Sequence, residues 1–125
     1  MSWIGEIAII FLNFRDSMKI YHWQTMSYAR HKASDKLLKN ISENIDKFIE
    51  VMQGCRNERL VLPVNNEMKL DNQSDSTALS LLNSFKKWLQ FNLGGYLKKE
   101  ETDLFNIRDE ILADVNQTLY LFSLK

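Results

Sequence analysis

HWQTMSYARHKASDKLLKNISENIDKFIE, residues 22–50, spans the end of one predicted helix, a turn and most of a second helix. The second helix places an apolar residue at every third or fourth position, the spacing of a stripe that is buried on one side. Its members are Leu38, Ile41, Ile45, Phe48 and Met52. The pairs His31/Asp35 and Asp46/Glu50 fall on one flank of this stripe, so we expect a continuous polar edge along the helix.

The same periodicity predicts an all-α fold with helices at about residues 3–24, 28–53, 75–92 and 102–122 of a single domain, residues 1–125. We expect Gly54 to end the second helix and Asp75 or Ser76 to cap the third. Residues 55–74 lack periodicity and contain Pro63, which indicates a long connection. A connection of this length predicts a crossover between helices 2 and 3, as in ferritin-like four-helix bundles.

The residue types of this stretch are those of a metal site. Imidazole and carboxylate together suit iron, zinc and manganese, whereas no thiolate cluster favours structural zinc, because Cys55 is the only cysteine. Helical neighbours four apart share a face, so His31 and Asp35 can hold one side of an ion, and so can Asp46 and Glu50. A single His-x-x-x-Asp or Asp-x-x-x-Glu is common on solvated helices, and the combination carries the prediction.

One helix cannot bring both pairs to one ion. Asp35 and Asp46 are eleven residues apart, which is roughly 16 Å along a helix. A two-fold partner solves this geometry, because antiparallel crossing near Asn40 and Ile41 brings His31/Asp35 of one chain opposite Asp46/Glu50 of the other. The spacing therefore predicts two identical sites between the chains of a homodimer.

These residues resemble Dps, the family of dodecameric miniferritins that oxidise iron at sites shared across a two-fold axis. In that family a His-Trp pair precedes His-x-x-x-Asp, and Asp-x-x-x-Glu follows eleven residues after that Asp; here they are His22-Trp23, His31…Asp35 and Asp46…Glu50. The resemblance is strong over residues 19–53 and architectural elsewhere. His22 and His31 are nine residues apart where the family usually has twelve, which predicts a shorter turn. The segments 21–23 and 44–48 are also similar to uncharacterised Dps-like proteins of large DNA viruses.

The resemblance implies an iron-binding miniferritin that oxidises Fe²⁺ with peroxide or dioxygen, stores the ferric product and protects against oxidative damage. It implies five metal ligands, His22, His31, Asp35, Asp46 and Glu50, with Trp23 nearby. Zinc or manganese would be substitutes for iron. The implied assembly is a homo-oligomer of two-fold dimers, up to the family's dodecamer, although the motif itself requires only the dimer.

Charge and composition narrow the other classes of function. Sixteen basic and sixteen acidic residues balance, and no basic arm is present, so we do not expect DNA binding or condensation. The apolar run of residues 7–12 is too short for a membrane span and lacks the features of an export signal, so we expect a cytoplasmic protein, or one in the host cytoplasm or virion if its source is viral. Gly-rich phosphate loops and Glu-x-x-His pairs are absent. The main alternative is a non-catalytic structural or virion-associated oligomer, in which the same histidines and carboxylates form an interface network of hydrogen bonds.

Overall fold

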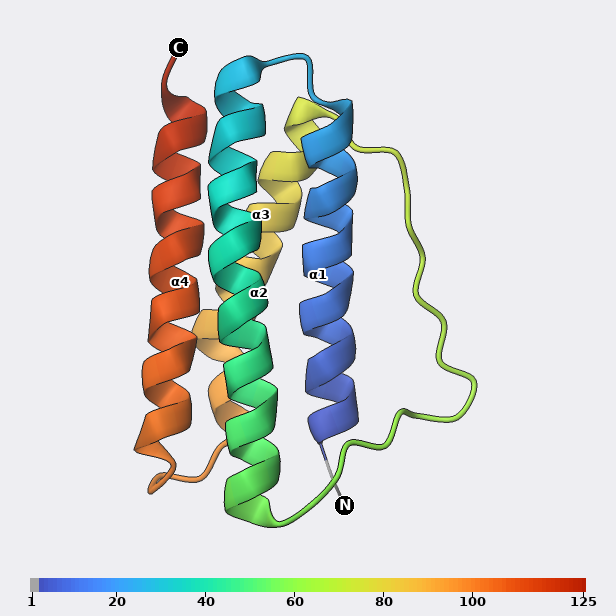
Figure 1. Cartoon of the computed structure of the whole chain (residues 1–125), viewed down its shortest axis with the longest axis vertical. Helices are drawn as coiled ribbons and strands as arrows, with labels where there is room; N and C mark the ends of the chain where they lie inside the picture. Colours follow the sequence, from blue (N-terminus) through green and yellow to red (C-terminus); the bar gives the residue numbers. More distant parts are fainter. Residues whose placement is uncertain (1–2) are drawn as a thin grey trace.

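The computed structural model describes residues 3–125, which form a bundle of four long helices. These are α1 (Ile4–Gln24), α2 (Tyr28–Arg56), α3 (Asp75–Phe91) and α4 (Thr102–Ser123), with a short 3-10 helix η1 (Leu93–Tyr96) before α4. Helices α2 and α3 run in the same direction because the long connection between them returns the chain to the opposite end of the bundle (Figure 1). The predicted all-α four-helix bundle with a crossover between its second and third helices is confirmed.

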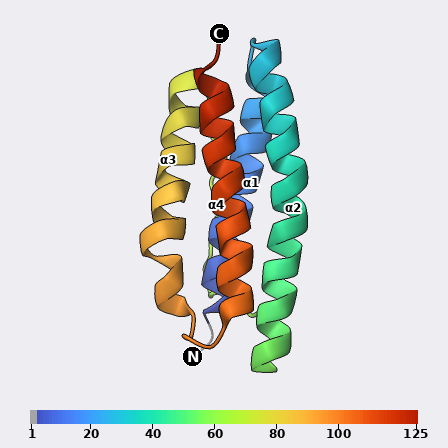
Figure 2. The ribbon, with the colours of Figure 1, turned by 90° about the vertical axis from the view of Figure 1, so that its left-hand side faces the viewer.

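Aromatic side chains fill the centre of the bundle. The ring of Phe11 on α1 meets Phe48 of α2 edge to face at 5.2 Å and Trp88 of α3 at 5.5 Å. One turn along α1, Phe14 stacks on Phe85 at 3.9 Å. Seen from the side of α4, that helix lies in front of α1 and between α3 and α2 (Figure 2). Burial of the predicted stripe of α2 against α1 and α4 is therefore what fixes its orientation.

Two helix ends differ from the sequence prediction. Gly54 does not end α2, which continues to Arg56 and closes on Asn57 in the left-handed conformation, at a φ of 50°. Asparagine accepts this conformation with little penalty, so the glycine is not needed there. Helix α3 is capped by Ser74 rather than by Asp75 or Ser76, because Ser74 and Thr77 exchange hydrogen bonds between side chain and backbone in a capping box.

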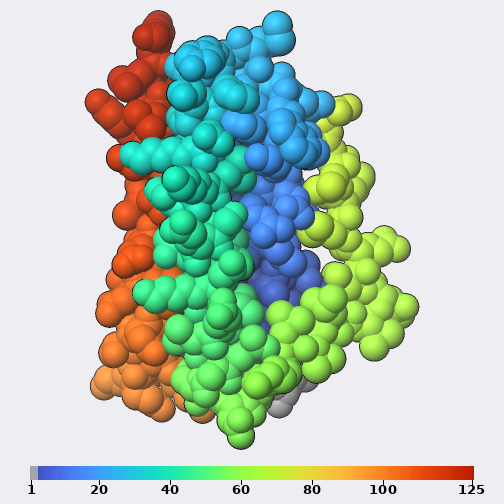
Figure 3. Space-filling model, in the orientation of Figure 1, coloured from blue at the N-terminus to red at the C-terminus, as the bar shows by residue number. Residues whose placement is uncertain are grey.

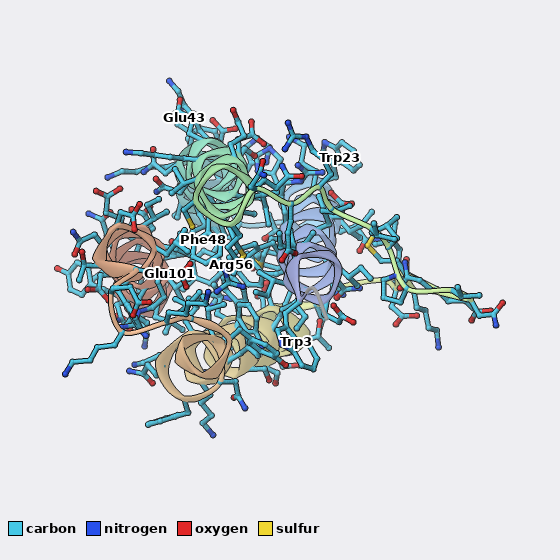
Figure 4. All side chains as sticks on the ribbon, turned by 90° about the horizontal axis from the view of Figure 1, so that it is seen from below. Trp3, Trp23, Glu43, Phe48, Arg56 and Glu101 are labelled. Carbon is cyan, nitrogen blue, oxygen red and sulfur yellow. The ribbon has the colours of Figure 1, made fainter. Side chains whose placement is uncertain are left out.

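A buried ion pair closes the end of the bundle where α2 leads into the crossover. The Arg56 guanidinium donates to both carboxylate oxygens of Glu101, at 2.7 and 3.0 Å, and also to the carbonyl of Tyr96 at 2.8 Å. The Lys98 amide donates to the same carboxylate at 2.7 Å. Figure 4 shows Arg56 and Glu101 inside the ring of helices, whereas Glu43 points outward from α2. This pair joins α2 to the loop that precedes α4.

The crossover follows the outer side of α1 and is attached to it at two places. Near its start, the carbonyl of Val61 lies so close to Gly5 that a Cβ on Gly5 would overlap it. Near its end, the Gln24 side chain donates to Asn72 at 2.9 Å and accepts from the amide of Gln73 at 2.7 Å. Between these attachments the chain bows away from the bundle (Figure 1). None of the helices in residues 3–125 is long and apolar enough to cross a membrane.

Candidate metal centre

A tight turn brings the two histidines together. Helix α1 ends at Gln24 and α2 begins at Tyr28, so only three residues separate them. Ser27 caps α2, and its hydroxyl accepts a hydrogen bond from the amide of Arg30 at 3.2 Å. His22 lies in the last turn of α1 and His31 in the first turn of α2. The nine-residue spacing therefore matches the short connection.

The two imidazole rings stack on each other. Their centroids are 3.9 Å apart, and their planes differ by 18°. Each ring is held by the backbone of the other residue: Nδ1 of His22 is 3.0 Å from the carbonyl oxygen of His31, and Nδ1 of His31 is 2.9 Å from that of His22. His22 is 6% exposed, whereas His31 is half-buried. The pair thus lies at the edge of the core, with one ring open to the surface.

These contacts fix which ring nitrogen carries the proton. A carbonyl oxygen can only accept, so Nδ1 of both His22 and His31 must be the donor. The buried Ser34 hydroxyl agrees with this, because it donates to the His31 carbonyl at 3.0 Å and accepts from Nδ1 of His22 at 2.9 Å. In the neutral state Nε2 of each ring therefore keeps its lone pair. A histidine whose Nδ1–H binds a carbonyl while Nε2 stays free is prepared for a metal.

The surroundings of His22 favour its neutral form. Burial lowers the pKa of His22, and the nearby positive charges of His31 and Lys19 lower it further. Since a metal ion binds only the unprotonated nitrogen, this depression makes His22 available as a ligand at neutral pH.

The three predicted carboxylates lie on the surface of α2. Asp35, one turn after His31, is exposed, and Asp46 and Glu50 are exposed farther along the helix. Within residues 3–125 of one chain, no three His, Cys, Asp or Glu side chains lie together closely enough to hold an ion. The structure therefore pairs His22 with His31, places Asp35 on the following turn, and leaves Asp46 and Glu50 at a separate position.

Two hollows on the face formed by α1 and α2 contain these carboxylates, and this face is toward the viewer in Figure 3. The upper hollow, of about 430 Å³, is lined by three basic residues, Arg15, Lys19 and Lys39, and by two acidic ones, Asp16 and Asp35. The lower hollow, of about 210 Å³, is lined by Asp46 and Glu50 together with apolar residues and no basic residue. The upper hollow therefore carries a small excess of positive charge, whereas the lower hollow is acidic.

At the level where the two chains are predicted to cross, the α1–α2 face is lined by the sequence neighbours of Asn40 and Ile41. Ile41 is fully buried in its own bundle, and Asn40 faces α4, where it lines a hollow together with Asp114. Neither residue can meet a partner on the α1–α2 face. At the same height the residues that line this face are Lys39 and Ser42, one on each side of the expected crossing level.

Sequence reasoning missed Ser34. Ser34 is a fully buried hydroxyl on the apolar face of α2. In the sequence, the signal for it is its position four residues before Leu38, in line with the apolar stripe. Trp23 follows His22 in sequence, but its side chain is 67% exposed, beside the Lys19 amino group. Cys55 is in the last turn of α2, where desolvation and a hydrogen bond to Glu101 raise the pKa of its thiol. A raised pKa disfavours the reactive thiolate, which argues against a redox role.

Fold and site together define a four-helix bundle protein with a stacked histidine pair at one end. The chain belongs to the family of unknown function DUF5856, whose sequence profile matches residues 22–122. That range begins at His22 and contains all five predicted ligands. No curated protein and no solved structure matches the chain significantly.

Proposed function

We propose that this protein is a Dps-like, iron-oxidising miniferritin whose sites form between two chains. The observation that carries the proposal is the histidine pair, in which both Nδ1 atoms donate to backbone carbonyls and neither Nε2 atom has a hydrogen-bond partner among residues 3–125. Metal-ligating histidines typically donate their other ring N–H to a backbone carbonyl or carboxylate in this way.

The stacking favours one ion per ring. An imidazole binds a metal in its own plane, along the lone pair of Nε2. Two nearly parallel rings at 3.9 Å cannot both direct that lone pair at a single ion. We therefore assign the substrate as two Fe²⁺ ions, one on His22 and one on His31, with Asp35 available to the latter.

A second chain would supply the remaining carboxylates. Antiparallel crossing at the level of Lys39 and Ser42 would set the acidic lower hollow of each chain over the upper hollow of the other, where basic residues outnumber acidic ones by three to two. Opposite charges would then face each other, which favours this pairing over a parallel one. Asp46 and Glu50 of a second chain would complete the coordination. Larger assemblies and storage of ferric mineral inside a shell are part of the same proposal.

The chemistry follows from the ligands. Hard carboxylate oxygens stabilise Fe³⁺ more than Fe²⁺, so they promote loss of an electron. With hydrogen peroxide, two Fe²⁺ ions each give one electron, the O–O bond breaks, and two protons complete two water molecules. With dioxygen, the same oxidation consumes more Fe²⁺ per oxidant. Either reaction would remove free ferrous iron and so protect the cell from oxidative damage.

Anaerobic titration with Fe²⁺, followed by peroxide, tests this function. We expect saturable binding at about two ions per chain, and a rapid rise of ferric absorbance. Asp46→Asn combined with Glu50→Gln should abolish the oxidation without unfolding the bundle, because both side chains are exposed. Glu43→Gln is the matched control, an exposed carboxylate on another side of α2 that should leave the rate unchanged. Oxidation at the full rate in the double variant would refute the site assignment.

One observation favours the structural alternative. Within residues 3–125, every buried side-chain nitrogen and oxygen has a hydrogen-bond partner in the single chain, so the histidine pair is satisfied without metal. A non-catalytic Dps-like structural protein would keep the same pair as a packing device. Native mass measurement with and without Fe²⁺ separates the two: a dimer that neither binds iron nor assembles further supports the structural role.

A further inference from the structure

A second pair of side chains runs parallel to the histidines. Tyr21 precedes His22, and Arg30 precedes His31, so the two pairs connect α1 and α2 at adjacent positions. The Arg30 guanidinium donates to the Tyr21 hydroxyl at 3.2 Å. Tyr21 is fully buried, and its own hydroxyl donates to the Asp75 carboxylate at 2.7 Å. The Tyr21 hydroxyl thus joins a partly buried guanidinium to a carboxylate at the surface.

The same pair reaches the other two helices. Asp75 is the first residue of α3, and Arg30 also donates to the carbonyl of Phe122, near the end of α4, at 3.2 Å. The guanidinium lies over the Phe122 ring, 4.7 Å from its centroid. One cluster of four side chains therefore ties all four helices together at the end of the bundle that holds the histidines.

The histidine stack needs such a tie. Its two Nδ1 bonds have lengths of 2.9 and 3.0 Å, and hydrogen bonds weaken steeply when the angle or distance changes. Apolar packing between α1 and α2 is non-directional and tolerates small sliding and rotation. The hydrogen bond between Arg30 and Tyr21, which precede the two histidines in sequence, restricts both the sliding and the rotation of α1 against α2 that apolar packing allows.

We propose that Tyr21 and Arg30 are positioning residues for the metal centre, and that they hold α1 against α2 in the register at which His22 and His31 stack with both Nε2 atoms free. Asp75 completes the cluster, and it couples the start of α3 to this corner. The part that concerns metal affinity rests on the proposed function. The part that concerns the histidine rings does not.

Tyr21→Phe is the sharpest test, because it removes one hydroxyl and keeps the buried ring. Tyr120→Phe is the matched control, since Tyr120 is 62% exposed and its hydroxyl takes no part in the hydrogen bonds that join Tyr21, Arg30, Asp75 and Phe122. With two histidines in the chain, long-range proton–nitrogen NMR spectra at a pH of about 8, where histidine is neutral, resolve both rings. Wild type and Tyr120→Phe should show both rings protonated at Nδ1, whereas Tyr21→Phe should show a mixture of tautomers.

Zinc titration of the three proteins gives a second readout that needs no oxidation. We expect Tyr21→Phe to bind Zn²⁺ about tenfold more weakly, the lower end of what outer-sphere partners contribute, and Tyr120→Phe to bind as wild type does. Asp75→Ala should reproduce the ring spectra of Tyr21→Phe. Its side chain is 66% exposed, so this variant keeps the core intact if Tyr21→Phe unfolds.

The outcomes separate this inference from the proposed function. Ring spectra identical to wild type in the folded variants would overturn the positioning role, whatever the zinc affinity. Absence of zinc and iron binding in wild type would refute the proposed function, while a change of tautomer in Tyr21→Phe would still support the positioning role. Unchanged zinc affinity together with altered rings would limit the role to the rings and overturn its part in metal binding.

Discussion

Replacing Glu101 by glutamine should destabilise the bundle and remove part of its dependence on pH. Four donors surround this carboxylate: two Arg56 nitrogens, the Lys98 amide and the Cys55 thiol, the last at 3.2 Å. The hydrogen bond from Arg56 lowers the pKa of Glu101 from 4.5 to about 2, against the opposing effect of burial. The folded protein therefore holds the ionised form much more strongly than the unfolded chain does.

The magnitude follows from linkage. Each tenfold change in proton affinity corresponds to about 1.4 kcal/mol, so a pKa of about 2 in place of 4.5 represents about 3 kcal/mol. Because the pKa is lower in the folded state, this stability is fully present above pH 4.5 and is lost as the pH falls toward 2. Removing one member of a buried pair costs about 3–5 kcal/mol, which is the same range.

Urea unfolding followed by circular dichroism, at equal protein concentration between pH 7 and 2.5, measures both effects. At neutral pH we expect Glu101→Gln to lose about 3 kcal/mol of unfolding free energy, and the difference from wild type should shrink as the pH falls below 4.5. Glu100→Gln, at the exposed neighbouring position, should change stability by less than about 0.5 kcal/mol. A loss below about 1 kcal/mol in Glu101→Gln, or an unchanged difference at all pH values, would refute the reasoning.

Three other substitutions test the fold and the corner. Gly5→Ala should detach the crossover at Val61, with a loss of about 1–3 kcal/mol and faster proteolysis within residues 61–71, since the new methyl group overlaps the Val61 carbonyl; unaltered proteolysis would contradict this. Asn57→Gly should raise the unfolding free energy by up to about 1 kcal/mol, because glycine adopts the left-handed conformation of this position without penalty. A lower melting temperature in the variant would contradict this and would show that the Asn57 side chain itself stabilises the end of α2. Ser34→Ala should cost about 1–2 kcal/mol in chemical denaturation and weaken zinc binding, since the hydroxyl lies between His22 and the His31 carbonyl; equal affinity in the variant would remove Ser34 from the site.

The local pattern of the chain determined the secondary structure. Apolar residues at every third or fourth position predicted four helices, and the ends of α1, α2, α3 and α4 lie within about three residues of those predictions. The length of the aperiodic segment around Pro63 predicted the crossover, because two helices that run in the same direction cannot be joined by a short turn. These signals are short in range, so a single sequence contains them.

The sequence determined part of the candidate metal site as well. Spacing on α2 determined which flank carries His31, Asp35, Asp46 and Glu50, since helical geometry fixes the face of each residue. Their completion by a second chain remains a prediction.

Only the tertiary structure decided the remaining contacts. The stacking of His22 on His31, and hence the free Nε2 atoms, depends on how α1 meets α2. The bonds from Arg56 to Glu101 and from Tyr21 to Asp75 join residues 45 and 54 positions apart, and no spacing rule relates them. Such pairs form where packing of the whole bundle brings two polar groups within reach of each other, and the buried member then needs the other as its hydrogen-bond partner. This requirement acts across the fold rather than along the chain, and for that reason the sequence alone could not reveal it.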